Sequence, residues 1–138
     1  MKKLIAVILC FVTLFSLFVP VYASGITTYS NNVYTTNVLF SISSAGKATV
    51  TSNYSGKPGL VTKATIETKI QKKFGLIWIN VDGGKWTDTS TNTNYSVSHS
   101  LQLSKTGKYR AHVEFTISGT GGSPDEITKN VEKTYTKP

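Results

Sequence analysis

Residues 109–117 alternate strictly between apolar and polar side chains, and this pattern constrains the fold more than any other feature of the chain. The apolar positions are Tyr109, Ala111, Val113, Phe115 and Ile117, and the positions between them hold Arg110, His112, Glu114 and Thr116. Successive side chains of a strand point to opposite faces, so a period of two predicts a strand with one face in a core and the other in solvent.

The same period recurs upstream. Residues 38–42 and 48–54 alternate on either side of a turn that contains Gly46, which predicts a hairpin. Residues 60–73 also alternate, and their many β-branched side chains favour a strand over a helix. Residues 74–81 are apolar on both faces, which is typical of a central strand or of one that a neighbouring loop covers.

The second half of the chain continues the pattern. Asp82, Gly83 and Gly84 predict a tight turn, and residues 87–94 predict a loop or a weak edge strand because they lack apolar side chains. Residues 95–103 alternate cleanly. A last strand is expected over residues 127–135, where Lys129 and Lys133 share the phase of the apolar side chains and suit an exposed edge. We therefore expect an all-β fold: an antiparallel sandwich of about seven strands.

The first 23 residues read as a secretory signal peptide, expected as a helix and cut before Ser24. Lys2 and Lys3 precede an apolar run over residues 4–19, and Val21 and Ala23 occupy the −3 and −1 positions. The run of about 16 residues is too short for a lasting membrane span. The protein is therefore expected to be secreted.

The only cysteine, Cys10, lies within this signal, so the mature chain has no disulfide and no thiol chemistry. The alternative, a lipid-attachment cysteine, is disfavoured by the bulky residues before it. After cleavage we expect a polar leader over residues 24–37 and one domain over residues 38–138. A domain of this length buries enough surface for a core without cross-links.

Basic residues exceed acidic ones in the mature chain. Fifteen Lys and Arg stand against seven Asp and Glu in the whole sequence, and Lys2 and Lys3 leave with the signal. Such an excess favours anionic partners such as cell-wall polymers, anionic lipid or glycans; the alternative is that it serves solubility alone. Nucleic acid is not expected, since aromatic and basic residues do not interleave.

Residues 101–111 show the most specific local pattern: a strand ending in leucines, a turn with Gly107, and then Tyr109 opening the next strand. This resembles the tyrosine corner of immunoglobulin-like sandwiches, in which the ring packs inside and its hydroxyl satisfies backbone groups at the crossing between sheets. A hydrophobic strand that ends in Lys72-Lys73 is followed by a strand with Trp78 and by a polar turn before Trp86. In these features the chain is similar to small secreted immunoglobulin-like or fibronectin-III-like proteins of Gram-positive bacteria. The resemblance implies a core without a disulfide, with Ala111 and Val50 in the cysteine positions.

Enzyme chemistry is not expected, and neither is a cofactor or a metal. His99 with Asp88 and Ser100 suggests a catalytic triad, but no nucleophile elbow accompanies them, so a half-buried structural histidine is the simpler interpretation. Glu67 and Glu114 are predicted on outward strand faces as neighbours in salt bridges, not as a hydrolytic pair. Two histidines on different strands with no cysteine make no zinc site.

The predicted function is that of a non-enzymatic binding or structural module whose partner is an anionic cell-wall polymer, a glycan or a protein. Trp78 is predicted in the core, and Trp86 with Tyr95 is a candidate aromatic surface for a sugar ring; the alternative is that Trp86 covers the open end of the sandwich. Loop 82–94 and the lysines Lys69, Lys72 and Lys73 would complete the contact. The second hypothesis is a cationic, bacteriocin-like or toxin-like effector of anionic membranes, which requires an apolar segment able to enter lipid. The sequence after Ser24 shows no obvious segment of that kind.

Overall fold

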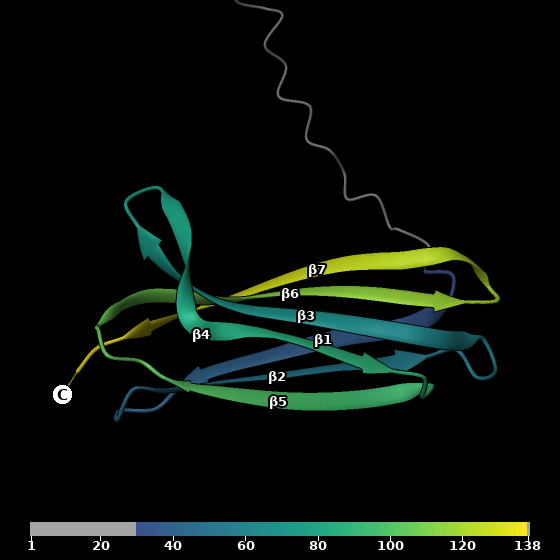
Figure 1. Cartoon of the computed structure of the whole chain (residues 1–138), viewed down its shortest axis with the longest axis horizontal. Helices are drawn as coiled ribbons and strands as arrows, with labels where there is room; N and C mark the ends of the chain where they lie inside the picture. The colour runs from purple at the N-terminus through teal and green to yellow at the C-terminus, as the bar shows by residue number, and fades with distance from the viewer. Residues whose placement is uncertain (1–29, 138) are drawn as a thin grey trace, which may run out of the picture.

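The computed structural model describes residues 30–137, which form seven strands in two antiparallel sheets (Figure 1). The strands are β1 (Val33–Ile42), β2 (Lys47–Gly56), β3 (Val61–Phe74), β4 (Ile77–Ser90), β5 (Asn94–Gln102), β6 (Gly107–Gly119) and β7 (Gly122–Tyr135). One sheet has the order β1-β2-β5 and the other has the order β4-β3-β6-β7. The expected all-β architecture and number of strands are confirmed, while the predicted signal-peptide helix lies outside the described residues.

The core lies between the inner faces of the two sheets. Every second residue is buried throughout β2 and over residues 64–70 of β3 and 109–117 of β6, as the period of two predicts. The largest apolar side chains that are fully buried are Phe115, Ile66, Ile70, Ile117, Val33, Val50 and Val113. Burying a side chain of this kind contributes about 1.5–3 kcal/mol, so apolar contact is the main interaction that holds the two sheets together.

Tyr109 lies where the chain crosses from one sheet to the other. Strand β5 belongs to the three-stranded sheet and β6 to the four-stranded one, so residues 103–106 connect the two layers. The Tyr109 ring is buried, and its hydroxyl donates a 2.6 Å hydrogen bond to the backbone carbonyl oxygen of Lys105. Burial also raises the pKa of the Tyr109 phenol. The hydroxyl thus satisfies a carbonyl group that the crossing leaves outside either sheet.

A buried polar cluster ties the start of β1 to the β6–β7 turn at the opposite end of the sandwich. The Asp125 carboxylate accepts hydrogen bonds from the backbone N–H groups of Asn31, Asn32 and Val33, at 2.6, 2.7 and 3.1 Å. The side chain of Asn32 is fully buried, donates to the carbonyl oxygen of Ser123 and accepts from the N–H of Gly121. The ordered domain therefore begins well before residue 38, and the expected boundary of the polar leader at residue 37 is wrong.

Strand β4 differs most from the sequence-based expectation. The segment 82–84 is not a turn between strands but a bulge within β4, where residues 81–84 lie opposite the single β3 residue Ile70. Gly83 has a φ of 73°, which a residue with a side chain rarely adopts, and Gly84 is buried against Ile70. The turn between β3 and β4 is at Gly75 and Leu76. Most of the expected loop 82–94 is therefore edge strand, and the actual loop is residues 91–93.

Strand β7 is the other edge of the four-stranded sheet, as the inward lysines predict. Lys129 and Lys133 are exposed, although they share the phase of Ile127 and Val131. The outer face of the three-stranded sheet is rich in hydroxyl groups, and Lys47 at the start of β2 is its charged residue within the described strands. Its cross-strand hydrogen bonds join Thr49 to Ser100 and Thr51 to Ser98, both at 3.0 Å.

The Asp125 cluster yields the first prediction. Replacing Asp125 with Ala removes the acceptor of three backbone N–H groups, which lowers the free energy of unfolding by roughly 2–4 kcal/mol because buried donors lose their partner. The matched control is Glu126→Ala, since the neighbouring Glu126 is exposed. Urea denaturation measures both variants, and equal stabilities would contradict the role assigned to Asp125.

Candidate functional site

The tip of the β3–β4 hairpin projects beyond the sandwich and exposes large apolar side chains. Figure 1 shows the hairpin rising away from both sheets at the end where the C terminus lies. Phe74 is 70% exposed, Leu76 96%, Ile77 60% and Ile79 48%. Within the described residues, the other large exposed apolar side chains are Tyr34 and Leu39 on β1. Apolar side chains gathered in one projecting segment are typical of an interaction surface.

Trp78 belongs to this hairpin, so its predicted place in the core is wrong. The Arg110 guanidinium lies 4.6 Å from the centroid of the Trp78 ring, and the Lys73 ammonium lies 5.9 Å from it. Arg110 also donates a 2.7 Å hydrogen bond from Nε to Oε1 of Gln71. These contacts fix the base of the hairpin against β6, and cation–π attraction keeps two positive charges beside the apolar tip.

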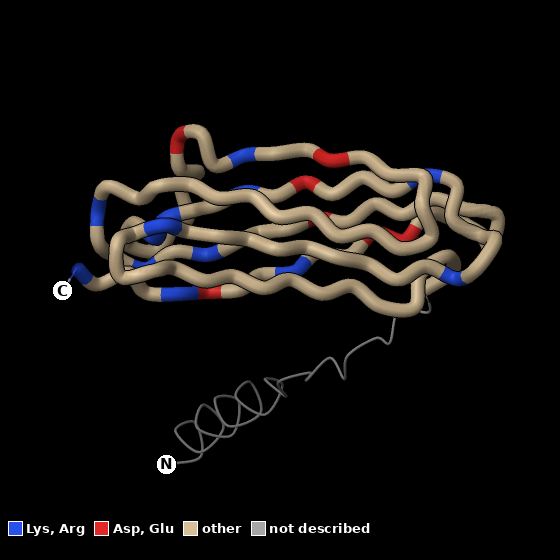
Figure 2. Tube along the Cα trace, turned by 90° about the horizontal axis from the view of Figure 1, so that it is seen from below, with Lys and Arg blue, Asp and Glu red and all other residues tan. Residues whose placement is uncertain are grey.

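Basic residues gather at this same end of the sandwich. The strand register places Lys47, Lys72, Lys73, Lys108, Arg110 and Lys133 near the hairpin end of their sheets, and Lys105 lies in the adjoining β5–β6 connection. The described acidic residues at this end are Asp82 and Glu132, and Glu132 forms an ion pair with Lys108. Figure 2 shows most of the blue segments toward this end. The folded domain is therefore electrically polarised along its long axis.

A surface groove of about 520 Å³ separates the hairpin from the β5–β6 connection. Phe74, Ile79 and Val81 line its hairpin side, and Lys105 lines the opposite side. The Lys72 ammonium lies 5.6 Å from the centroid of the Tyr109 ring, which closes the inner end. The groove thus has an apolar wall on one side and lysines on the other, and it lies directly below the hairpin tip.

The three lysines proposed from the sequence do not form one cluster. Lys69 lies on the outer face of the four-stranded sheet, 3.0 Å from Glu114 and 3.8 Å from Glu67. The two glutamates are direct cross-strand partners, so the predicted salt-bridged neighbours are confirmed. Lys72 lies in the inward phase of β3, over Tyr109, whereas Lys73 lies over Trp78 on the outward face. Only Lys72 and Lys73 are next to the hairpin tip.

Trp86 is half-buried and packs against the core at the open side between the two sheets. Its ring stacks on His99, with 4.8 Å between centroids and 3° between planes. The His99 Nε2 lies 2.7 Å from Oδ2 of Asp88, and this pair joins edge strand β4 to edge strand β5. Trp86, His99 and Asp88 therefore close the open side between the sheets. Trp86 thus has a covering role, as the sequence offered in the alternative, but at the side of the sandwich and not at its end.

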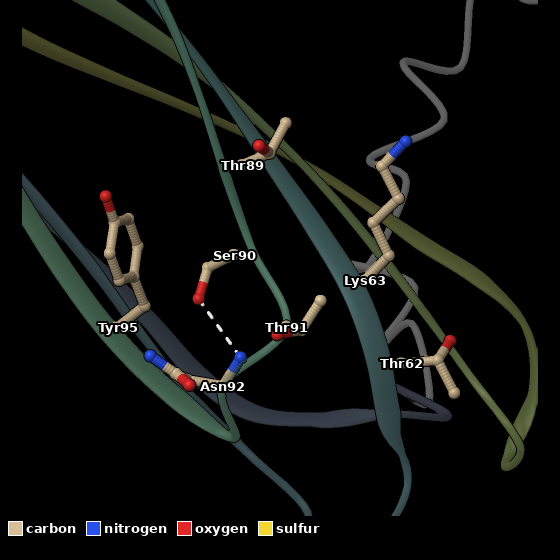
Figure 3. Close-up of a pocket in the computed structure, with 7 residues that line it drawn as sticks. All are labelled: Thr62, Lys63, Thr89, Ser90, Thr91, Asn92 and Tyr95. Carbon is tan, nitrogen blue, oxygen red and sulfur yellow. Dashed lines mark hydrogen bonds between the residues drawn. The ribbon is translucent and has the colours of Figure 1, made fainter.

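Tyr95 lies apart from Trp86, 6.4 Å from the ring of Tyr54. It lines a shallow pocket of about 430 Å³ formed by Thr62, Lys63, Thr89, Ser90, Thr91, Asn92 and Tyr95. Figure 3 shows Tyr95 and Lys63 on opposite sides of this pocket, with the bond from Asn92 N–H to Ser90 Oγ between them. Of the two residues of the expected aromatic surface, Tyr95 thus lines this pocket, whereas Trp86 is stacked on His99 between the sheets.

Comparisons with known proteins add no relative. No protein-family model matches this chain, and significant similarity is found neither to a curated protein nor to a solved structure. Residues 30–137 hold no group of three or more His, Cys, Asp or Glu side chains placed to bind a metal ion. Over the same residues, no helix has the length and apolar character needed to cross a bilayer.

The residues that sequence reasoning missed are Phe74, Leu76, Ile77 and Ile79. Their segment is apolar on both faces, and this pattern predicts a central or covered strand. The signal against that interpretation was local: the lysines 72 and 73 immediately precede the apolar run, and Gly75 interrupts it. A central strand rarely begins with two charged residues and a turn.

The two tryptophans yield the second prediction. Trp86→Ala lowers the free energy of unfolding by about 2 kcal/mol, because it removes a half-buried ring packed against the core. Trp78→Ala lowers it by less than about 1 kcal/mol, because its contacts are cation–π contacts at the surface. Chemical denaturation of both variants measures the difference. A larger loss for Trp78→Ala would contradict the placement of both rings.

Glu114 yields the third prediction. Hydrogen bonds from Lys69 and His112 hold the pKa of Glu114 below its ordinary value of 4.5. A carboxylate with a lowered folded-state pKa stabilises the fold above pH 4.5, and this contribution is lost as the pH falls through the folded-state value. Glu114→Gln is thus less stable than wild type at pH 7, by less than about 1 kcal/mol because the pair is partly exposed. The difference should vanish in strongly acidic solution, and a difference independent of pH would contradict the ion pair; Glu126→Gln is the control.

Proposed function

We propose that this protein is an exported, non-enzymatic binding module that acts through the hairpin end of its sandwich on an anionic partner at a cell surface. The observation that carries the proposal is the coincidence of two features at one end. The apolar hairpin tip and most of the positive charge lie together, although they come from separate parts of the chain. The opposite end, with Lys57 and Lys63 near Asp125 and Glu126, is balanced in charge.

A binding role also agrees with the contacts that the histidine and glutamate side chains make. His99 is engaged by Asp88 and stacked on Trp86, so its imidazole supports the closure of the sandwich. Glu67 and Glu114 share Lys69 as a counter-ion, which argues against a hydrolytic carboxylate pair. The hairpin end offers positive charges and apolar side chains, and both can bind a partner.

The proposal includes a fold family and a location. The strand orders β1-β2-β5 and β4-β3-β6-β7, with the Tyr109 hydroxyl bonded to Lys105 at the crossing, support an immunoglobulin-like or fibronectin-III-like sandwich. Export rests on the signal pattern of residues 1–23. A fold stabilised without a disulfide is compatible with export because the core is continuous between both sheets.

The fourth prediction tests this function by reversing the charge of two lysines at the hairpin end. The exported form, residues 24–138, is presented to immobilised lipoteichoic acid, wall teichoic acid and anionic vesicles. Lys73→Glu/Lys105→Glu should weaken binding at least about tenfold, because it reverses two charges at the hairpin end. The control Lys63→Glu/Lys129→Glu has the same net charge and changes exposed lysines elsewhere.

The control variant should retain binding within about threefold, since only the overall attraction changes. Equal losses in the two variants would show that net charge alone matters and would contradict a defined surface. Failure of the wild-type protein to bind any of these polyanionic surfaces would contradict the proposal as a whole.

A further inference from the structure

We infer that the partner of the hairpin end is an anionic lipid bilayer, with the tip inserted among the headgroups and the surrounding lysines on the lipid phosphates. This inference rests on the proposed function and names its partner. It goes beyond attraction of a cationic protein to polyanions, because it assigns separate tasks to the apolar tip and to the basic residues beneath it.

Packing within the domain does not explain why the hairpin tip is apolar. Ile70 is the last fully buried residue of β3, and the hairpin beyond the bulge leaves the core. A solvent-exposed turn is ordinarily built from polar residues and glycine. Here Phe74, Leu76 and Ile77 occupy it instead. Side chains that are apolar, exposed and unused by the core indicate burial against something outside this domain.

The hairpin also has the right construction for shallow entry into a headgroup layer. Its backbone groups are paired across the two strands, from Gln71 with Asn80 to Phe74 with Ile77. Few backbone groups therefore lose hydrogen bonds when water is displaced around the tip. Lys73 lies one residue below Phe74, so the depth of insertion is limited to the turn itself.

The charged and aromatic groups lie at the level where headgroups would be. Trp78 is at the base of the tip between Lys73 and Arg110, and tryptophan favours the boundary between acyl chains and water. Lys72 and Lys105 line the groove below, with Asp82 as the acidic residue of its lining. Clustered lysine and arginine beside an apolar segment favour bilayers that carry anionic lipid.

A bilayer fits this surface better than the other anionic partners. Teichoic acids and acidic glycans would use the lysines but would leave Leu76 and Ile77 exposed to water. A protein partner would need a complementary acidic groove around the tip, whereas a lipid surface accommodates any small apolar protrusion ringed by positive charge. The lipid surface therefore accounts for both features of the hairpin end.

The fifth prediction tests the tip and the charge separately. The exported form, without residues 1–23 whose apolar run would itself bind lipid, is sedimented with vesicles of phosphatidylcholine containing about 30 mol % phosphatidylglycerol. Leu76→Ser/Ile77→Ser should weaken vesicle binding at least about tenfold, since it removes the apolar contact, and should leave binding to immobilised wall teichoic acid within about threefold. The matched control is Tyr34→Ser/Leu39→Ser, which removes exposed apolar side chains from β1. Circular dichroism checks that both variants stay folded, as expected of exposed positions.

Tryptophan fluorescence locates the tip directly. Vesicles with brominated acyl chains should quench the wild-type protein, and Trp78→Phe should abolish most of this quenching because Trp86 stays packed against the core. Undiminished quenching in Trp78→Phe would overturn the inserted orientation.

The remaining outcomes distinguish the two proposals. Wild-type binding to wall teichoic acid but not to vesicles would overturn the lipid partner and leave the proposed function in place. Full vesicle binding by Leu76→Ser/Ile77→Ser would also overturn insertion. Capture on intact cells that is abolished by prior protease treatment of the cells would assign the tip to a protein partner instead. Absence of binding to vesicles, polymers and cells would end both proposals.

Discussion

The inward side chains of β2, β3 and β6 hold the two sheets together, and the rest of the molecule is arranged around this contact. No disulfide joins the two sheets within residues 30–137. A strand therefore packs on the opposite sheet only over the part of its length where its side chains are buried. Strand β3 loses this burial after Ile70, where the bulge at residues 81–84 of β4 begins. The hairpin is therefore released from the sheets at the point where the core ends, and its tip is free to carry side chains that the core does not need.

Antiparallel topology explains why the charges gather at one end. Every second connection of an antiparallel sandwich lies at the same end of the molecule, so the turns near residues 45, 75 and 105 and the end of β7 are neighbours. Lysines from segments that are 25 to 32 residues apart in the sequence thus surround one hairpin. Their mutual repulsion is a cost to the fold, and an anionic partner that neutralises them would relieve it. The lysines and the apolar tip therefore belong to one surface.

Most of the fold was predictable, and the candidate site was not. Strict alternation in residues 109–117 correctly located the best core strand, and the turn with Gly107 before Tyr109 correctly located the crossing between sheets. Trp78, which is expected in the core, lies on the projecting hairpin, whereas Trp86 packs against the core, close to the covering role that the sequence offered as its alternative. Alternation shows which residues share a face, but it does not show whether a second sheet extends far enough to cover that face.

The sequence by itself determined the class of fold, the approximate number of strands, the absence of a cysteine beyond Cys10 and the excess of positive charge, because these follow from local period and composition. Only the tertiary structure decided that β4 continues through the glycines at 83 and 84, that the hairpin tip is exposed and that the lysines converge on it. Those properties depend on strand pairing between distant segments and on where the core ends. Neither is encoded in the pattern of any single segment.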